Sequence, residues 1–338
     1  MNHLLKSCLF YGASRIGELA FISQRFAARA AIISFHEIQR DFQSELMTGT
    51  SVDLFEYSID WLQREGWSIV SFDECLEKLA NDDQSGRYAV LTFDDGYRDN
   101  VSVALPILER HNAPFMMYVP TGALTRSMQC WWLALRRLFL SRDTVVIEAL
   151  GRKFHCSDIR TKTSALADVI RWVHEDYRRA ALLAPTFKQN GISLAAMNDE
   201  YFLDERELIK LARHPLASIG GHTSSHPALA TLDRSSARTE LADNRAYLEN
   251  LLQFSVRHVA YPYGTLGACG RREEDLASEV GYQTAVTTQQ GRLYNDKVNH
   301  FALPRIGFHS RSSFTARMSG IFEAVQALHR PRSSVVPR

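Results

Sequence analysis

The stretch YAVLTFDDG at residues 88–96 decides the fold class of this chain. Its first six residues are apolar apart from Thr92, which is typical of a strand buried on both faces of a parallel sheet. Two adjacent acids and a glycine then end the run, as they do in a tight turn. A buried strand that stops at polar residues predicts an α/β protein with chemistry at the strand end.

Similar strands recur along the chain and alternate with helical patterns. We expect strands at 31–35, 68–71, 88–93, 115–119, 217–221, 258–261, 284–287 and 302–306. Helices are expected at 53–65, 73–79, 100–111, 204–213, 237–252 and 273–280. Such alternation indicates βα units around a parallel sheet. The prediction is a closed or nearly closed (β/α) barrel of about seven strands, and a doubly wound open sheet is the alternative.

The alternation breaks between residues 124 and 199, where strands are sparse and the pattern is mostly helical. Long excursions from a compact domain are usually functional, so we interpret 124–199 as a helical insertion that forms a lid or contacts substrate. The barrel domain is predicted to span 31–325. An N-terminal helical segment at 1–30 precedes it, and a disordered basic tail at 326–338 follows it.

Composition describes an ordinary globular protein, with 45% hydrophobic residues, 23% charged residues and a formal net charge of +1. Phosphate binding needs a clustered basic excess, so no nucleic-acid partner is expected. The five cysteines are scattered without a Cys-x-x-Cys pair, which indicates neither a disulfide framework nor a thiolate zinc site.

Charged residues interrupt the N-terminal segment too often for a signal peptide or a membrane span. We therefore expect a cytoplasmic protein. The same segment could form an amphipathic helix that touches a membrane surface peripherally, or one that packs against the domain.

Three polar motifs begin where apolar strands stop: LTFDDGY at 91–97, HTSSH at 222–226 and AYPYG at 260–264. Each alone is an ordinary turn or surface sequence. In parallel α/β folds the strand carboxyl ends share one face, so these distant motifs can converge. One carboxylate and two imidazoles suit a hydrolytic metal site that keeps a position open for water. An adjacent second carboxylate can take the proton of that water, which is commonly worth about 10²- to 10⁴-fold in rate.

The segments TFDDG at 92–96, HTSSH at 222–226 and YPYG at 261–264 resemble the first three motifs of the polysaccharide deacetylases, the NodB-homology group within carbohydrate esterase family four. The resemblance covers roughly residues 31–310 without the insertion. It implies a distorted (β/α) barrel of about seven strands. It also implies Asp94 as general base, Asp95, His222 and His226 as metal ligands, and the Tyr263 backbone N–H as oxyanion donor.

The resemblance also suggests residues that contact substrate. His36, in the sequence Phe35-His36-Glu37, matches a histidine found at this strand end in one branch of the family. Aromatic side chains near the motifs, with Trp131 and Trp132 among them, could stack on a sugar or simply belong to the core. The expected substrate-binding residues are His36, Tyr97, Tyr261 and Pro262.

Two positions depart from the family pattern. Ala260 stands where the third motif usually begins with an arginine that orients the base, and we expect Arg305 to replace that arginine. The leucine-histidine pair that supplies the general acid has no clear counterpart. His309 is the candidate acid, with His300 as an alternative.

The cofactor expected from these residues is one divalent metal ion, with zinc first and cobalt, nickel or manganese also compatible with the ligand set. The expected substrate is an N-acylated amino sugar in a polysaccharide, oligosaccharide or glycoconjugate, from which the acetyl group is removed. Removal of formyl or another acyl group from a lipid-linked or small amino sugar is one alternative. Carbohydrate binding without catalysis is the other, and the oligomeric state is left open.

Overall fold

The computed structural model describes residues 28–40, 46, 49–81, 83, 85–294 and 298–319. The expected tail at 326–338 lies outside these residues, as does nearly all of the expected N-terminal helical segment 1–30.

Seven parallel strands form a nearly closed barrel in which each strand pairs with the next one around the ring. In ring order they are β1 (Ala30–Phe35), β5 (Arg87–Phe93), β6 (Phe115–Val119), β9 (Ala217–Gly221), β10 (His258–Ala260), β11 (Thr284–Gln290) and β12 (Leu303–Arg305). The ring closes where Ile306 bridges Ile33, with the Ile306 N–H donating to Ile32 at 2.7 Å and the Ser34 N–H donating to Ile306 at 3.1 Å. The predicted barrel is confirmed, and the open sheet is excluded.

One expected strand lies beside the ring and not in it. β4 (Trp67–Ile69) pairs with the first half of β5, from Arg87 to Ala89. β6 pairs with the second half of β5, from Leu91 to Phe93. The two therefore share one edge of β5, which explains how eight predicted strands make a seven-stranded barrel.

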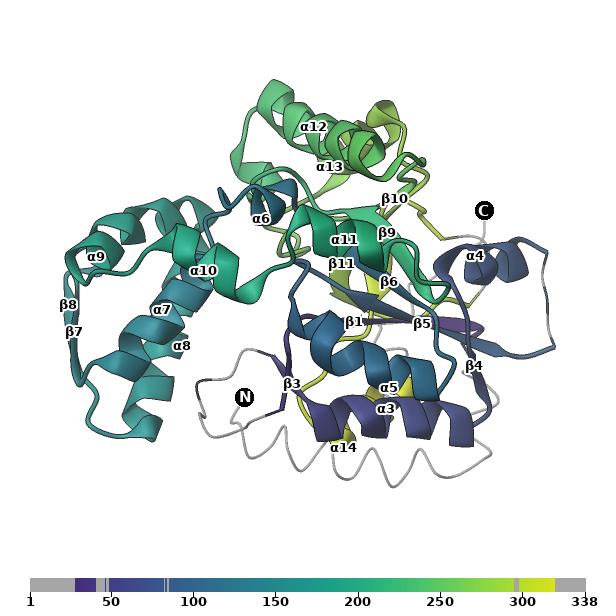
Figure 1. The fold of residues 1–338 in the computed structure, drawn as a ribbon, viewed down its shortest axis with the longest axis horizontal. Helices are drawn as coiled ribbons and strands as arrows, with labels where there is room; N and C mark the ends of the chain where they lie inside the picture. Colours follow the sequence, from purple (N-terminus) through teal and green to yellow (C-terminus); the bar gives the residue numbers. More distant parts are fainter. Residues whose placement is uncertain are drawn as a thin grey trace, which may run out of the picture.

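Helices surround the barrel (Figure 1). Each turns an apolar face inward, as α3 does with Phe55, Ile59 and Leu62. The outer helices are α3 (Val52–Arg64), α4 (Phe72–Ala80), α5 (Leu105–Arg110) with its preceding π-helical turn η1 (Asn100–Ala104), α11 (Glu205–Leu211), α12 (Arg234–Leu252), α13 (Arg271–Val280) and α14 (Arg311–Met318). Two minor elements are the short parallel pair β2 (Ile38–Gln39) and β3 (Thr50–Ser51) and the 3-10 turn η4 (Leu229–Thr231).

The segment expected as a helical insertion packs as a lobe at one side of the barrel, on the left of Figure 1, with a hydrophobic cluster of its own. The short helix α6 (Thr121–Leu124) precedes the lobe and lies near α12. The elements of the lobe are α7 (Trp131–Ser141), β7 (Thr144–Ile147), η2 (Glu148–Leu150), β8 (Arg152–His155), α8 (Ile159–Glu175), η3 (Tyr177–Leu183), α9 (Ala184–Gln189) and α10 (Leu194–Tyr201). The segment is mostly helical, as expected, but it also contains the antiparallel hairpin of β7 and β8, which was not predicted. Val145 and Ile147 are buried while Val146 is exposed, which is strand periodicity that the sequence reading missed.

A buried ion pair joins this lobe to the barrel. The Arg136 guanidinium, on α7, donates to Glu37 just after β1, with Nη1 2.6 Å from Oε2 and Nη2 2.9 Å from Oε1. Both side chains are almost fully buried. The lobe is thus tied directly to the strand end that carries His36.

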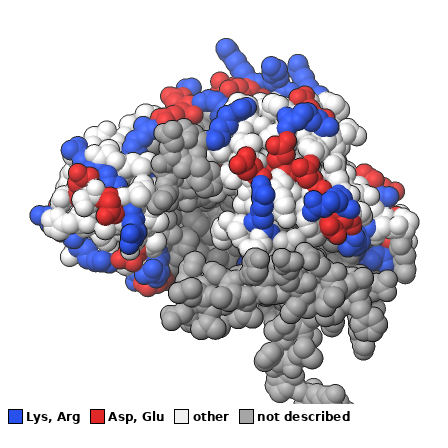
Figure 2. Space-filling view, turned by 90° about the horizontal axis from the view of Figure 1, so that it is seen from below, with Lys and Arg blue, Asp and Glu red and all other residues white. Residues whose placement is uncertain are grey.

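Basic and acidic side chains are interspersed on the face that Figure 2 shows, without a patch of one sign among the coloured residues. Within the described parts of the chain, the structure contains no helix that combines the length and the apolar character required to cross a membrane.

Candidate active site

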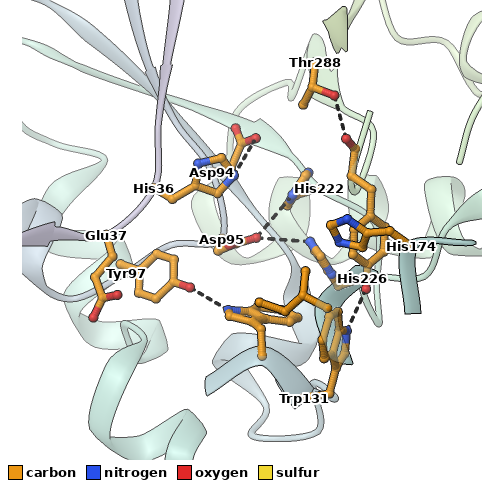
Figure 3. Close-up of a pocket in the computed structure, with 13 residues that line it drawn as sticks. His36, Glu37, Asp94, Asp95, Tyr97, Trp131, His174, His222, His226 and Thr288 are labelled. Atoms are coloured by element: carbon orange, nitrogen blue, oxygen red, sulfur yellow. Dashed lines mark hydrogen bonds and ion pairs between the residues drawn. The ribbon is translucent and has the colours of Figure 1, made fainter. Parts of the chain in front are cut away.

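The three motifs meet at the carboxyl ends of the barrel strands. Asp94 and Asp95 follow β5, His222 follows β9, and Tyr263 lies three residues beyond β10. They face a pocket of about 220 Å³ into which the insertion contributes side chains from α7 and α8 (Figure 3). The described residues that line it are His36, Glu37, Asp94, Asp95, Tyr97, Trp131, Trp132, Ile170, His174, His222, His226, Tyr263 and Thr288.

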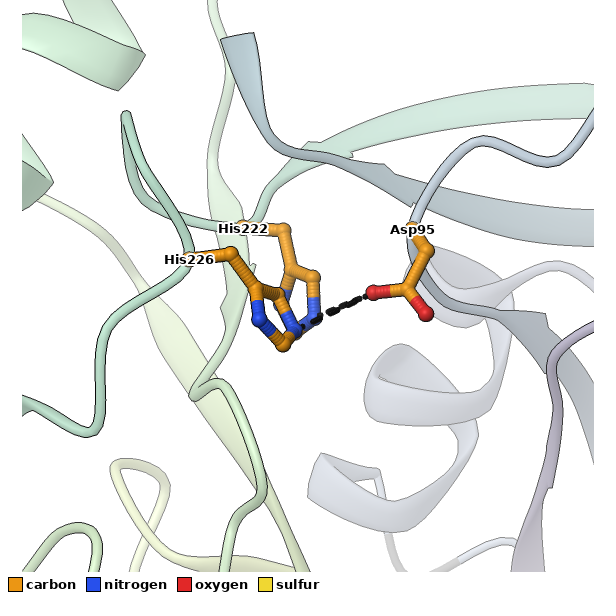
Figure 4. A group of neighbouring side chains, drawn as sticks. All are labelled: Asp95, His222 and His226. Carbon is orange, nitrogen blue, oxygen red and sulfur yellow. Dashed lines mark ion pairs between the residues drawn. The ribbon is translucent and has the colours of Figure 1, made fainter. Parts of the chain in front are cut away.

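Asp95, His222 and His226 form a compact cluster (Figure 4). Asp95 Oδ1 lies 3.3 Å from His222 Nε2 and 3.2 Å from His226 Nε2. The backbone of Asp95 has φ 71° and that of His226 has φ 63°. Left-handed backbone at non-glycine residues costs free energy and is concentrated at functional sites. These conformations aim the three ligand atoms at one point.

A backbone contact fixes the His222 ring. Its Nδ1 lies 2.7 Å from the Ala260 carbonyl oxygen, which can only accept a hydrogen bond. Nδ1 is therefore the protonated nitrogen, and Nε2 presents its lone pair towards Asp95 and His226. This arrangement is the usual support of a metal-binding histidine.

The cluster fits a divalent cation. Asp95 Oδ1 is buried and accepts no hydrogen bond from the described residues, and a buried carboxylate oxygen without a partner is costly. Burial alone would raise the pKa of Asp95, but the facing His226 and His222 rings hold this pKa well below its ordinary value. One oxygen and two nitrogen ligands with an open side match a catalytic zinc site or a site for a related metal.

Arg305 holds the second aspartate. Its guanidinium donates to both Asp94 oxygens, at 2.7 Å from Nη1 and 2.6 Å from Nη2, and its Nε donates to the Thr287 carbonyl at 2.9 Å. Arg305 is fully buried. Burial would raise the pKa of Asp94, but the Arg305 charge holds this pKa below its ordinary value. The structure thus pairs Arg305 with Asp94, whereas Ala260 brings no charge to the site.

Tyr263 presents an unused backbone donor. Its φ is 61°, and its N–H makes no hydrogen bond within the described residues. The ring packs on His226 with centroids 5.1 Å apart, and the hydroxyl accepts a hydrogen bond from Trp131 Nε1 at 3.0 Å. The side chain therefore fixes the loop while the N–H remains available.

Two of the expected substrate-binding residues line the pocket. The Tyr97 hydroxyl accepts a hydrogen bond from Trp132 Nε1 at 2.8 Å. His36 Nε2 lies 3.8 Å from Asp94 Oδ2, and its side chain is 45% exposed towards the opening. Figure 3 places His36 on the far side of the two aspartates from His222 and His226.

The other two expected residues lie outside the described pocket lining. The Tyr261 side chain is in the core, where its hydroxyl donates to the Phe301 carbonyl at 3.1 Å. Side chains of neighbouring residues point to opposite faces in extended chain, and Tyr261 faces the helix layer. Pro262 belongs to the turn after β10, where its carbonyl accepts a hydrogen bond from the Gly264 N–H at 2.7 Å.

The two candidate acids are also elsewhere. His309 is exposed at the start of α14, where its backbone N–H donates to Ser313 at 3.1 Å. His300 precedes β12 and therefore lies at the amino ends of the strands, opposite the pocket. Neither lines the pocket.

Four lining residues were missed by the sequence reading: Glu37, Ile170, His174 and Thr288. Glu37 directly follows His36 at the end of β1, so it could have been predicted as a pocket residue from this position. Ile170 and His174 belong to α8 of the insertion, and the sequence carries no signal of how α8 docks. The His174 ring keeps an exposed surface and packs near Trp131, Tyr177 and Tyr263.

A nearly closed barrel with an acidic pair and two histidines at its strand carboxyl ends defines a class, that of the hydrolases with a (β/α)-barrel fold. A family model described as polysaccharide deacetylase matches residues 81–148 and 177–285, together more than half of the chain. The chain therefore belongs to the polysaccharide deacetylase family of carbohydrate esterase family four, and its enzyme class is deacetylase.

One curated relative and two solved structures are similar to this chain. The relative is a putative polysaccharide deacetylase, YxkH of Bacillus subtilis (strain 168), 22% identical over 294 residues that cover 85% of this chain and 74% of the relative. The deacetylase PplD of Streptococcus pyogenes, solved with acetate, has a TM-score of 0.57 at 19% identity, covering 89% of this chain and 98% of its own. IcaB of Ammonifex degensii has a TM-score of 0.57 at 15% identity, covering 87% and 97%. The two structures support the fold.

Proposed function

We propose that this enzyme is a metal-dependent hydrolase that removes N-acetyl groups from amino sugars in a glycan or glycoconjugate. The observation that carries the proposal is the buried cluster of Asp95, His222 and His226, with Asp94 next to it and an open pocket in front. Family membership supports an N-acylated carbohydrate as substrate. The aromatic walls made by Tyr97 and Trp132 suit an apolar sugar face or a methyl group.

Asp95, His222 and His226 would hold the cation, and zinc, cobalt, nickel and manganese all suit these ligands. When bound, the cation supplies Lewis-acid polarisation of the amide carbonyl and a more acidic water. The buried surroundings of the three ligands keep bulk water from competing with the substrate.

Asp94 takes the proton of the attacking water as the new C–O bond forms. Its place beside Asp95 puts it next to that water, and the Arg305 guanidinium keeps it ionised and fixed in orientation. The free Tyr263 backbone N–H donates to the amide oxygen as negative charge grows there.

His36 donates the proton that the departing amine needs. The C–N bond breaks, the sugar nitrogen leaves as a free amine, and acetate is the second product. His36 lies beside Asp94 and keeps an exposed edge in the pocket, so it can reach both the substrate nitrogen and the base. We assign this role to His36 in place of His309 because His309 lies outside the pocket lining.

Acetate release from chito-oligosaccharides by the metal-loaded protein tests the base. Asp94→Asn keeps the size of the side chain but removes the basic oxygen, so we expect acetate release to fall by about 10²- to 10⁴-fold while the metal stays bound. Release at the native rate by Asp94→Asn would eliminate the proposal, as would native release after complete metal removal.

A matched pair of histidine variants tests the acid. His36→Gln should lose about 10²-fold or more of kcat because no proton reaches the amine, and His309→Gln should keep the native rate. Equal rates for His36→Gln and the native enzyme, with a loss in His309→Gln, would return the acid role to His309.

A further inference from the structure

A second cavity lies behind one wall of the active-site pocket. Its volume is about 510 Å³, against about 220 Å³ for the pocket. It lies between the insertion, which contributes η3 and α9, and the barrel loop 225–232. Trp131, His226 and Tyr263 line both spaces, so the cavity and the pocket are neighbours with a shared wall.

Trp131 is the residue of the insertion in that wall. Its indole N–H donates to the Tyr263 hydroxyl at 3.0 Å, and only 4% of the residue is exposed. Tyr177 supports Tyr263 from the other side, with ring centroids 4.4 Å apart and its hydroxyl 2.9 Å from Thr265. Figure 3 shows the Trp131 indole at the edge of the pocket with a dashed line to its hydrogen-bond partner. The wall is thus a packed, hydrogen-bonded partition.

Both linings are largely apolar, but the two spaces differ in their ionisable side chains. The pocket carries the polar groups of His36 and Glu37 on one side, whereas Thr288 lies across the pocket, where its hydroxyl donates to the Tyr263 carbonyl at 2.7 Å. The cavity behind Trp131 is lined mostly by alanine, leucine and aromatic side chains, such as Ala180 and Phe187, with Arg178 as its charged residue. A polar sugar suits the first lining, and an aliphatic chain suits the second.

The position of the substrate's N-acyl amide determines which part of the substrate contacts Trp131. The carbonyl must lie between the Asp95, His222 and His226 cluster and the Tyr263 N–H. The sugar then extends towards the polar lining and the exposed edge of His36. The acyl group extends the other way, against the indoles that flank His226 and Tyr263.

We propose that Trp131 determines acyl-chain specificity by closing the active site off from the apolar cavity, so that acetyl fits and longer N-acyl chains are rejected. This inference rests on the proposed function. A hydrophobic wall can discriminate by about 10- to 200-fold for each methylene that it excludes. Removing the indole joins the two spaces and gives an acyl chain of several carbons an apolar compartment.

The test measures free amine released from N-acetyl-, N-butyryl- and N-hexanoyl-glucosamine oligosaccharides by the full chain. For Trp131→Ala and Trp131→Leu, the ratio of kcat/KM for hexanoyl over acetyl should rise by about tenfold or more above the native ratio. Trp131→Leu keeps an apolar side chain in the core of the insertion. It can therefore be measured even if Trp131→Ala does not fold.

Ala180→Trp provides the matched control, because it fills the cavity without touching the pocket. Alone it should leave acetate release unchanged, and added to Trp131→Leu it should cancel the gain on hexanoyl substrate. Native-like hexanoyl-to-acetyl ratios in folded Trp131 variants would overturn the inference.

If the native enzyme releases amine from none of these substrates, the proposed function fails. The role of Trp131 as a wall between the pocket and the cavity is then tested by ligand binding. Calorimetric titration with N-hexanoyl-glucosamine should show tighter binding to Trp131→Leu than to the native chain. Equal affinities would overturn the assignment of Trp131.

Discussion

The pairing of Asp94 with Arg305 shows how one side chain replaces another across the barrel. Ala260 offers no charge at the end of β10, yet Asp94 still accepts two hydrogen bonds, because Arg305 reaches it from β12. Two parallel bonds between a guanidinium and a carboxylate fix orientation as well as charge. The base is therefore held in one rotamer and in its ionised form.

Arg305→Met should move the acid limb of the pH profile of kcat/KM to higher pH. Asp94 works as a carboxylate, so activity is lost as pH falls through its pKa. Arg305 lowers that pKa against the effect of burial, and without the guanidinium burial acts unopposed and the pKa rises. The measurement is kcat/KM for acetate release across about pH 3–8, a range that includes the ordinary carboxyl pKa of about 3.9.

Thr287→Val is the control for that profile, because the Thr287 carbonyl that Arg305 uses belongs to the backbone and remains. Its acid limb should stay in place. An unmoved limb in Arg305→Met would show that the guanidinium does not set the ionisation of the base.

Among individual residues, the sequence predicted those that belong to a recognisable motif at a strand end. Asp94, Asp95, His222 and His226 could be selected because each follows an apolar strand, and strand ends of a barrel converge. Tyr261 could not be placed correctly, because side-chain direction at a strand end depends on one residue of register. His309 lies in the loop between β12 and α14, and the sequence pattern does not give the path of that loop. The contact of Arg305 with Asp94 could be anticipated only because Ala260 left a charge to be replaced.

Among the elements outside the barrel, α7 and α8 contribute most to the site. They place Trp131, Trp132 and His174 in the lining of the active-site pocket. The Glu37–Arg136 pair is the buried polar link between α7 and the end of β1. Burial removes both charged groups from water, which costs free energy. Their two close hydrogen bonds offset this desolvation cost only while both partners are present. The lobe should therefore be sensitive to loss of either one.

Arg136→Met should lower the free energy of unfolding by about 3–5 kcal/mol, because it leaves the Glu37 carboxylate buried without its partner. The double variant Glu37→Met/Arg136→Met removes both charges and should recover most of that loss. Urea denaturation followed by circular dichroism measures both. A double variant no more stable than Arg136→Met alone would show that the pair does not act as a unit.

The hairpin of β7 and β8 was missed because the helical residues on both sides dominated the pattern. Thr144–Ile147 is nonetheless a run of β-branched residues, which favour strands. The docking of the lobe could not be read from the sequence at all, since it depends on contacts between residues about one hundred positions apart, such as Arg136 and Glu37.

For the whole molecule, the apolar runs favoured a closed or nearly closed barrel of about seven strands, but periodicity alone could not exclude an open sheet. Most neighbouring strands share several paired residues, whereas β12 and β1 meet through the single bridge of Ile306 and Ile33. The active-site pocket opens at the carboxyl ends of this ring, where the Asp-His-His cluster ties β5 to the loop after β9. A bound cation would therefore join segments more than one hundred residues apart in the chain.

Metal removal should accordingly lower the melting temperature of the whole protein. A ligand that binds only the folded chain stabilises it by about 2.7 kcal/mol at one hundred times its dissociation constant. We expect a chelator to lower the melting temperature of the native enzyme and to leave that of Asp95→Asn unchanged. The measurement is differential scanning calorimetry with and without chelator, and an equal drop in both proteins would place the stabilising metal elsewhere.

The proposed metal site is tested most directly by the metal content of the purified protein, measured by elemental mass spectrometry. We predict one divalent transition-metal ion per native chain, its loss in His222→Gln and in His226→Gln, and its retention in His309→Gln. Full metal content in the His222 and His226 variants, or a native protein that binds no divalent metal when zinc is supplied, would contradict the assignment of Asp95, His222 and His226 as the metal site.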